Sequence, residues 1–195
     1  YEYFKAINHA SDHGIKIKDI SLDLEQMLVR KEKVVEDLTR GISGLFKLNK
    51  VSSLRGTAKI KKDLTIEVTD EEGSLKLISA DNIILATGSK PVELDCAPTD
   101  QSIVITSKEA LNIKQVPNEI IIIGSGAIGL EIGSIWSRLG SKVTLLEELE
   151  QLLPQADKQV STAAMKIFKD QGLDIRLGTN IESVETNNEK VFIKC

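Results

Sequence analysis

The hydrophobic and polar positions along the first fifty residues follow a helical spacing. Residues 1–13 are compatible with a helix that ends at Gly14, a residue suited to the turn after a helix. A longer helix is predicted from about residue 24, with an apolar stripe repeating at three, four or seven residues and charges such as "RKEK" on its other side. The stripe consists of Leu24, Leu28, Val35, Leu38, Ile42 and Leu45. We expect it to pack into a core.

Between residues 51 and 85 the pattern changes to short alternating pieces. "TIEVTD" and "SLKLIS" are separated by "TDEEG", whose glycine and acidic residues favour a turn, so an antiparallel β-meander is predicted. The meander leads into "NIILATGSKP", an apolar run closed by Thr87, Gly88, Ser89 and Pro91. This run is predicted to be a buried strand that presents a glycine turn at its carboxyl end, where α/β sheets place ligands.

The segment from Pro91 to Pro117 is mixed in pattern and is interpreted as a crossover between two units. It holds one short predicted helix, because Thr106 and Glu109 have the spacing of a capping box. The chain shows no internal repeats and no low-complexity tracts.

The last third of the chain has the clearest alternation of strand and helix. Strands are predicted at residues 120–123 and 142–147, with a helix over 127–139 between them that Gly140 ends. A further helix is predicted over 157–171, before Gly172. One face of that helix is predicted to hold Val160, Ala164 and Ile167. Short strands follow at "LDIRL", "IESVE" and "KVFIK", and the order predicts an α/β fold with a right-handed parallel crossover.

Composition and charge narrow the classes of partner. The 195 residues are 41% hydrophobic, enough for one large or two small domains. The formal net charge is −4 with both signs interleaved, which argues against binding to nucleic acid or to an anionic membrane. No apolar run approaches the roughly 20 residues that span a bilayer. Cys96 and Cys195 have no metal or redox spacing, so a reducing, intracellular compartment is expected.

A metal site is not predicted. His9 and His13 stand at i and i+4, a spacing that could hold a metal on one helical face. No third ligand lies at a suitable offset, so a solvated helix face is the preferred interpretation. The sequence begins at Tyr1 without a methionine and stops inside the strand-like "EKVFIKC", and we therefore expect a piece of a longer protein.

The candidate chemistry is concentrated in "EIIIIGSGAIGLE". Gly124 permits a tight turn, Gly126 lets the backbone approach a pyrophosphate, and Gly129 lets the following helix pack closely on its strand. The amino terminus of that helix presents N–H groups to phosphates. Glu147 ends the next strand, where a carboxylate accepts hydrogen bonds from an adenosine ribose. Because strand, turn and helix are all present in order, we interpret the motif as a dinucleotide site and not as a structural turn.

The nature of residue 147 also predicts which cofactor is preferred. A ribose 2′-phosphate would come within about 4 Å of Glu147, which costs roughly 1 to 4 kcal/mol depending on hydration. The following "ELEQLLPQA" contains no arginine or lysine that could compensate, so NAD is predicted over NADP. Glu131, one helical turn beyond Ala127, is compatible either with a cofactor contact or with a surface carboxylate favoured by the helix dipole.

Several stretches resemble the dihydrolipoamide dehydrogenase family of flavoprotein disulfide reductases. "SLDLEQMLVRKEKVVEDLTRGISGLFKLNKV" is similar to the helix after that family's redox-active disulfide, and "RGTAKI" to its adenine-contacting turn. "IILATGSKP" resembles its flavin-domain segment, and "IIIIGSGAIGLEIGSIWSRLGSKVTLLE" its NAD-binding unit. The resemblance implies a partial FAD-binding domain of helices and a β-meander, joined to a partial Rossmann-like NAD-binding domain.

The resemblance also implies domain limits and cofactor contacts. Residues 1–117 would be the carboxyl-terminal part of a first FAD-domain segment with a crossover linker, and residues 118–195 an incomplete NAD-binding domain. FAD would be contacted by Ala58, Thr87, Gly88 and Ser89. NAD would be contacted by Gly124, Ser125, Gly126, Ala127, Ile128, Gly129, Leu130, Glu131, Glu147 and Ile181, with Glu131 near the nicotinamide and Ile181 against the adenine.

The implied activity is oxidation of protein-bound dihydrolipoamide through a redox disulfide and FAD, with hydride transfer to NAD. The implied partners are a lipoyl-bearing subunit of a 2-oxoacid dehydrogenase complex and a second copy in a homodimer. The family's Cys-x-x-x-x-Cys pair and His-Glu pair have no counterpart in these residues, so no catalytic residue is assigned and this segment alone is expected to be inactive. Two alternatives remain: another flavoprotein disulfide reductase, such as a mercuric or glutathione reductase-like protein, and a non-catalytic NAD-binding module.

Overall fold

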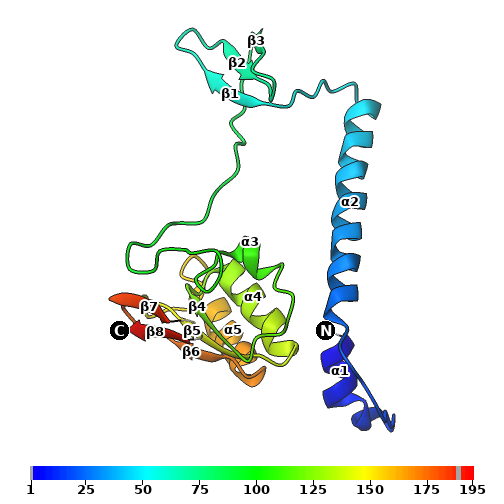
Figure 1. Cartoon of the computed structure of the whole chain (residues 1–195), viewed down its shortest axis with the longest axis vertical. Coiled ribbons are helices and arrows are strands. Elements are labelled where there is room, and N and C mark those ends of the chain that lie inside the picture. The colour runs from blue at the N-terminus through cyan, green and yellow to red at the C-terminus, as the bar shows by residue number, and fades with distance from the viewer. Residues whose placement is uncertain (1, 188–189) are drawn as a thin grey trace. The chain divides into compact units, whose positions relative to one another are not determined.

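The computed structural model describes residues 2–187 and 190–195. The chain forms two compact units (Figure 1). One unit combines the chain up to Leu28 with Pro91–Cys195, and the other is Val29–Lys90. The domain limit expected after residue 117 stays a prediction.

The two helices predicted at the start of the chain are present. Helix α1 spans Glu2–His9 and is followed by a short 3-10 helix, η1, Ser11–His13, which Gly14 ends with a φ of 72°. Helix α2 spans Leu24–Leu48, and the Asp23 carboxylate accepts a hydrogen bond of 2.8 Å from the backbone N–H of Gln26 in its first turn. Within the described residues, no helix combines the length and apolar character that crossing a membrane requires.

The packing expected for the stripe of α2 is wrong over most of its length. Leu24 is buried, but Val35, Leu38, Ile42 and Leu45 are between 49% and 65% exposed. Helical periodicity identifies which side of a helix is apolar, whereas burial also needs a partner surface. The described part of the chain does not supply that partner for residues 35–45.

The predicted β-meander is confirmed. Strands β1 (Thr57–Ile60), β2 (Ile66–Thr69) and β3 (Leu75–Ile78) form an antiparallel sheet in the order β1-β2-β3. Asp70 shapes the turn between β2 and β3, because its carboxylate accepts hydrogen bonds from the N–H groups of Glu72 and Ser74 at 3.0 and 2.8 Å.

The buried strand predicted at "NIILATGSKP" is not formed. Residues 82–90 have no regular secondary structure, and Ile84 and Leu85 are 90% and 71% exposed. An apolar run becomes a buried strand only when a neighbouring strand takes up its backbone hydrogen bonds. The structure records no strand pairing for this run in the residues it describes.

The parallel α/β unit is formed as predicted. Strands β4 (Glu119–Ile123), β5 (Lys142–Leu146) and β6 (Asp174–Arg176) are parallel and lie in the order β4-β5-β6. Helix α4 (Ala127–Arg138) packs on β4 and β5, and α5 (Lys158–Asp170) packs on β6 (Figure 1).

The core of this unit lies between the sheet and its helices. Val143 and Leu145 of β5 are almost fully buried, and Trp136 of α4 is 3% exposed. The indole Nε1–H of Trp136 donates to the carbonyl oxygen of Ala110 at 3.2 Å, which joins α4 to the short helix α3 (Ser107–Ala110). The predicted capping box of α3 is present. These contacts fix α4, and therefore its amino terminus, against the sheet.

The apolar face predicted for α5 is only partly right. Ala164 packs against the core, together with Met165 and Phe168, but Val160 and Ile167 are more than half exposed. On α5 two apolar stripes, offset by one residue, both satisfy helical spacing: one contains Val160 and Ile167, and the other contains Met165 and Phe168. The stripe with the larger side chains, Met165 and Phe168, removes more apolar area from water and is the one that is buried.

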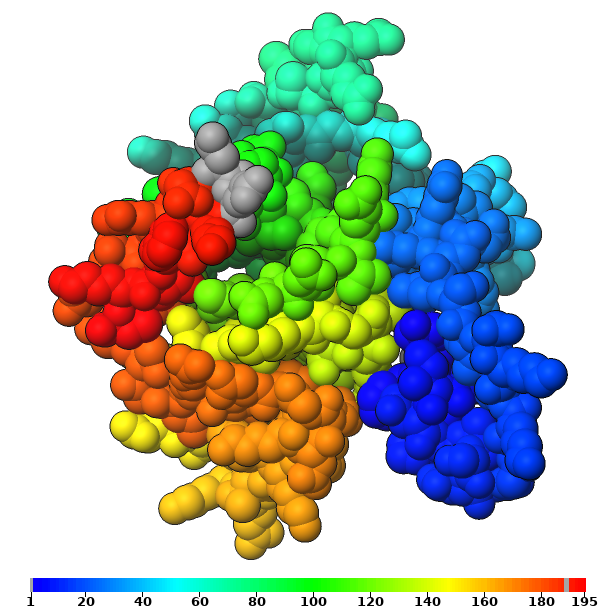
Figure 2. All heavy atoms as spheres, turned by 60° about the horizontal axis from the view of Figure 1, so that its bottom comes forward, coloured from blue at the N-terminus to red at the C-terminus, as the bar shows by residue number. Residues whose placement is uncertain are grey.

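The short strands predicted at "IESVE" and "KVFIK" are present as β7 (Ser183–Asn187) and β8 (Lys190–Lys194), and the structure shows that they pair antiparallel as a hairpin. The backbone N–H of Val184 in β7 donates to the carbonyl oxygen of Cys96 at 2.8 Å. The crossover segment is therefore tied to the hairpin. In the space-filling view the hairpin, in red, lies at the edge of the visible surface (Figure 2).

Candidate dinucleotide-binding site

The turn between β4 and α4 has the conformation that its glycines predict. Gly124 has a φ of 101°, and its N–H donates to the carbonyl oxygen of Leu146 in β5 at 2.8 Å. Gly126 is the residue before the first turn of α4, in extended conformation with a φ of −67°. A Cβ built on Gly126 would meet no atom within 4 Å. The missing side chain therefore leaves open space beside the helix amino terminus, as the approach of a phosphate requires.

Gly129 is constrained by packing and not by its backbone angles. A Cβ at this position would overlap the carbonyl oxygen of Gly124 and would lie 3.3 Å from Cγ2 of Ile122. One turn later a Cβ at Gly133 would press on Ile122 and Leu173 at 3.2 Å. These two glycines let α4 lie close to β4, which brings the amino terminus of the helix to the carboxyl end of the strand.

Glu147 lies where the sequence predicts a ribose carboxylate. It follows β5 directly, is 9% exposed, and accepts a hydrogen bond of 2.7 Å at Oε2 from the backbone N–H of Ser125. Its other oxygen, Oε1, accepts from the N–H of Leu149 at 3.0 Å. A carboxylate has about four acceptor positions, so each oxygen keeps one for a ligand hydroxyl.

The hydrogen bonds at Glu147 also hold it in the ionised form. Burial raises the pKa of the carboxyl group, but the N–H groups of Leu149 and Ser125 lower it by more, so the pKa of Glu147 lies below its ordinary value. A negative charge is therefore present at the end of β5 at neutral pH.

The lowered pKa predicts a pH dependence of stability. Because the folded protein holds Glu147 ionised more strongly than the unfolded chain, the contribution is complete above about pH 4.5 and is lost as the pH falls through the folded pKa. The free-energy difference in urea unfolding between the wild type and Glu147→Gln should therefore shrink on acidification below that value. A difference that stays constant down to about pH 3 would contradict this reasoning.

A loop after β5 completes the turn, and residue types alone hardly indicate it. Leu153 has a left-handed backbone with a φ of 48°, and its N–H donates to the carbonyl oxygen of Ser125 at 3.2 Å. Leu152 beside it is fully buried. Ser125 is thus held on both sides, by Glu147 and by Leu153. Backbone donors of this kind leave no mark in residue types, and only the apolar "LLP" in an otherwise polar run could have indicated the loop.

The carboxyl end of β6 is attached to the same region. The N–H of Thr179 donates to the carbonyl oxygen of Glu147 at 2.8 Å, and the N–H of Gly178 donates to that of Leu149 at 3.2 Å. Ile181, the predicted adenine contact, is half-buried just beyond. The ends of all three parallel strands therefore meet at one edge.

The remaining predicted site residues divide into three groups. Ala127, Ile128 and Glu131 are exposed on the first turns of α4, whereas Leu130 is buried in the core. Ser125 is fully buried. The residues expected to contact FAD belong to the other compact unit and are exposed. They are Ala58 in β1 and Thr87, Gly88 and Ser89 in the irregular segment.

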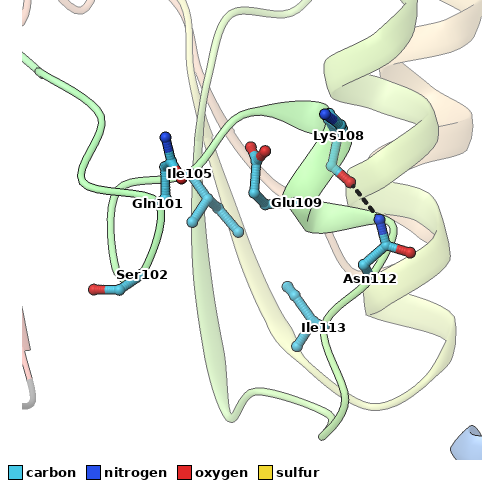
Figure 3. Close-up of a pocket in the computed structure, with 7 residues that line it drawn as sticks. All are labelled: Gln101, Ser102, Ile105, Lys108, Glu109, Asn112 and Ile113. Carbon is cyan, nitrogen blue, oxygen red and sulfur yellow. Dashed lines mark hydrogen bonds between the residues drawn. The ribbon is translucent and has the colours of Figure 1, made fainter.

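A separate pocket beside α3 is not part of this arrangement. It is lined by Gln101, Ser102, Ile105, Lys108, Glu109, Asn112 and Ile113 (Figure 3). Asn112 donates to the carbonyl oxygen of Lys108 at 2.9 Å, and the Glu109 carboxylate accepts from the N–H of Thr106 at 3.0 Å. The Asn112 and Glu109 side chains therefore serve the ends of α3, and none of the predicted nucleotide residues lines the pocket.

The fold and the edge described above have the architecture of the class of α/β proteins that bind dinucleotides. The sequence profile of the pyridine nucleotide-disulphide oxidoreductase family matches residues 3–195. The chain belongs to this family, and the resemblance to flavoprotein disulfide reductases is confirmed.

Curated relatives cover nearly the whole chain. The mitochondrial dihydrolipoyl dehydrogenase of Dictyostelium discoideum is 42% identical over 182 residues, which are 93% of this chain and 37% of the relative. The dihydrolipoyl dehydrogenase of Cupriavidus necator is 38% identical over 197 residues, 99% of this chain and 40% of the relative. The leghemoglobin reductase of Vigna unguiculata is 35% identical over 189 residues, 97% and 36% respectively. The chain thus spans well under half the length of these relatives.

Solved structures show the same fold. LpdA from Mycobacterium tuberculosis superposes with a TM-score of 0.85 at 21% identity, covering 98% of this chain and 42% of LpdA. The HOCl-induced flavoprotein disulfide reductase RclA from Escherichia coli, in a Cu(II) complex, gives a TM-score of 0.70 at 25% identity over 99% and 42%. The α/β fold class predicted from the sequence is confirmed.

Proposed function

We propose that the β4-β5-β6 edge binds NAD and that the chain is part of a dihydrolipoyl dehydrogenase. The observation that carries the NAD site is the buried Glu147 carboxylate, held 2.7 Å from the N–H of Ser125 beside the glycine turn. A carboxylate fixed at this point can accept hydrogen bonds from both hydroxyls of an unmodified adenosine ribose.

The residues of the turn would act in two ways. Gly124, Gly126, Ala127 and Ile128 would hold the pyrophosphate at the amino terminus of α4, where unpaired N–H groups and the helix dipole favour an anion. Glu131, exposed on the next turn, would lie towards the nicotinamide.

Two other predicted residues would shape the site from within. Ser125 and Leu130 are buried, so their contribution would be to hold Glu147 and to pack α4. Gly129 would act in the same indirect way by letting α4 approach the turn. Ile181 would pack against the adenine.

In the other unit, FAD contacts are assigned to the four exposed residues Ala58, Thr87, Gly88 and Ser89. Gly88 has a φ of 79°, which a residue with a side chain rarely adopts, and open space surrounds its missing Cβ. A backbone of this kind can approach a flavin nucleotide closely. FAD supplies the electron transfer between thiols and nicotinamide when it is bound.

The activity proposed for the whole protein is oxidation of protein-bound dihydrolipoamide with NAD. The proposal is supported by 35–42% identity to curated dihydrolipoyl dehydrogenases over most of the chain. It places the protein with a lipoyl-bearing subunit of a 2-oxoacid dehydrogenase complex, as a homodimer, in the bacterial cytoplasm or the mitochondrial matrix. The relatives include proteins named as mitochondrial and a bacterial one.

The NAD site predicts a preference between the two nicotinamide cofactors. NADH should bind this chain at least roughly tenfold more tightly than NADPH, because a 2′-phosphate would stand against the Glu147 carboxylate. Residues 148–156 contain no basic side chain to offset that charge. Titration calorimetry of both nucleotides at one ionic strength measures the ratio.

The matched control for this preference is Glu147→Gln, which keeps the shape of the side chain and removes its charge. In this variant the ratio of the affinity for NADH to the affinity for NADPH should fall towards one. Equal affinities in the wild-type chain would rule out the proposed role of Glu147, whereas a ratio that survives in Glu147→Gln would move the preference to another residue.

A further inference from the structure

The ends of the three parallel strands lie side by side in the order β4-β5-β6, which matches the order of pyrophosphate, ribose and base in a dinucleotide. Gly124 follows β4 directly, Glu147 follows β5 directly, and Gly178 and Thr179 come shortly after β6. Neighbouring strands lie about 4.8 Å apart. A nucleotide with its pyrophosphate at Gly124 and its ribose at Glu147 therefore places its base over the end of β6. This reasoning rests on the NAD site proposed above.

Glu150 is the polar side chain that the structure brings to this point. Gly178 has a φ of 61°, and a Cβ built on it would lie 2.5 Å from Oε1 and 3.1 Å from Cδ of Glu150. The carboxylate of Glu150 therefore lies directly over the backbone of Gly178, in space that only a glycine leaves open. The N–H of Gly178 donates to Leu149 at 3.2 Å, which keeps the two segments together.

The Glu150 carboxylate has acceptor capacity left for a ligand. It makes no hydrogen bond or ion pair within residues 2–187 and 190–195. A carboxylate that is ionised accepts hydrogen bonds and donates none. The edge of adenine carries an exocyclic amino group that donates, whereas hypoxanthine carries a carbonyl oxygen at the same position that can only accept.

We propose that Glu150 is a specificity-determining residue that selects adenine, by accepting a hydrogen bond from the exocyclic amino group of the base. Gly178 makes this possible because its missing side chain lets the carboxylate lie over the end of β6. Glu147 would thus accept hydrogen bonds from the ribose, and Glu150 would accept one from the base. Both residues belong to the segment that follows β5.

The test compares NADH with its deamino form, in which hypoxanthine replaces adenine, by calorimetric titration of the 195-residue chain. The wild type should bind NADH roughly three- to tenfold more tightly than deamino-NADH, the range expected for one hydrogen bond to an exposed charged group. Glu150→Ala should bring this ratio close to one by weakening NADH alone. Glu150→Gln should also bring the ratio close to one, in this case by strengthening deamino-NADH binding, because its amide can turn a donor towards the hypoxanthine oxygen.

Glu148→Ala is the matched control, since it removes an exposed carboxylate two residues away and should leave the ratio unchanged. Any general effect of charge on the phosphates changes both nucleotides equally and cancels in the ratio. A ratio that Glu150→Ala leaves at its wild-type value, or that Glu148→Ala abolishes equally, overturns the assignment of Glu150. A folded chain that binds neither nucleotide overturns the NAD site itself, and with it this inference.

Discussion

Replacing Gly129 by alanine is expected to destabilise the α/β unit by about 3 kcal/mol and to abolish detectable NADH binding. The new Cβ would overlap the carbonyl oxygen of Gly124 and press on Ile122. Neither neighbour can move easily. Gly124 is held because its N–H donates a hydrogen bond to the carbonyl oxygen of Leu146, and Ile122 is held within β4. Helix α4 therefore has to move away from the strand. Its amino terminus then leaves the position that a pyrophosphate would need. Urea unfolding and NADH calorimetry measure the two losses.

The size of this effect is set by packing, because alanine by itself favours a helix over glycine by about 1 kcal/mol. Gly126→Ala is the matched control in the same turn. A Cβ there meets no atom within 4 Å, so its cost in stability should stay below about 1 kcal/mol while NADH affinity falls. If the free energy of unfolding of Gly129→Ala lies within about 0.5 kcal/mol of the wild-type value, then Gly129 is not required for the close approach of α4 to the turn.

Replacing Glu147 by alanine should weaken NADH binding roughly 30- to 300-fold, since two hydrogen bonds from ribose hydroxyls to a charged acceptor are removed. The same change should lower the free energy of unfolding by about 1 to 3 kcal/mol, because the N–H groups of Ser125 and Leu149 lose their acceptor. Ser125 is fully buried, so water does not readily replace the lost partner.

The control for Glu147→Ala is Glu148→Ala, which removes the adjacent, exposed carboxylate. Its effect on unfolding should stay within about 0.5 kcal/mol, and NADH affinity should change little. Unaltered NADH affinity in Glu147→Ala would show that the ribose does not reach the end of β5. Fluorescence titration of NADH against the three proteins distinguishes these results.

Local signals in the sequence were sufficient for most elements. The capping box at Thr106 and Glu109, the turn at Gly124 and the strand ending before Glu147 are all found where their residue types predict them. Each of these depends on atoms close together in the chain. The dinucleotide interpretation follows from the same stretch, because the glycine spacing and the carboxylate at its fixed offset occur within one strand-helix-strand unit. The family was indicated separately, by the resemblance of several stretches along the chain.

The failures have one physical cause. The stripe of α2 and the run "NIILATGSKP" are apolar in the right pattern, yet Leu38 is 65% exposed and Ile84 is 90% exposed. A side chain is buried only when another part of the protein packs against it. The pattern of apolar residues in one segment describes that segment and not the surface that would cover it. On α5 two overlapping stripes were both acceptable, and the sheet beneath selected the one that contains Phe168.

The sequence by itself determined the strand-turn-helix unit, the dinucleotide motif and the sign of the charge at residue 147, because these depend on backbone freedom and residue chemistry over short distances. Only the tertiary structure decided that Ser125 and Leu149 hold the Glu147 carboxylate, that Leu153 closes the turn, and that Glu150 lies over Gly178. Those contacts join backbone groups of separate loops, and a backbone N–H is the same in almost every residue, so its partner is fixed by the fold and not by residue type.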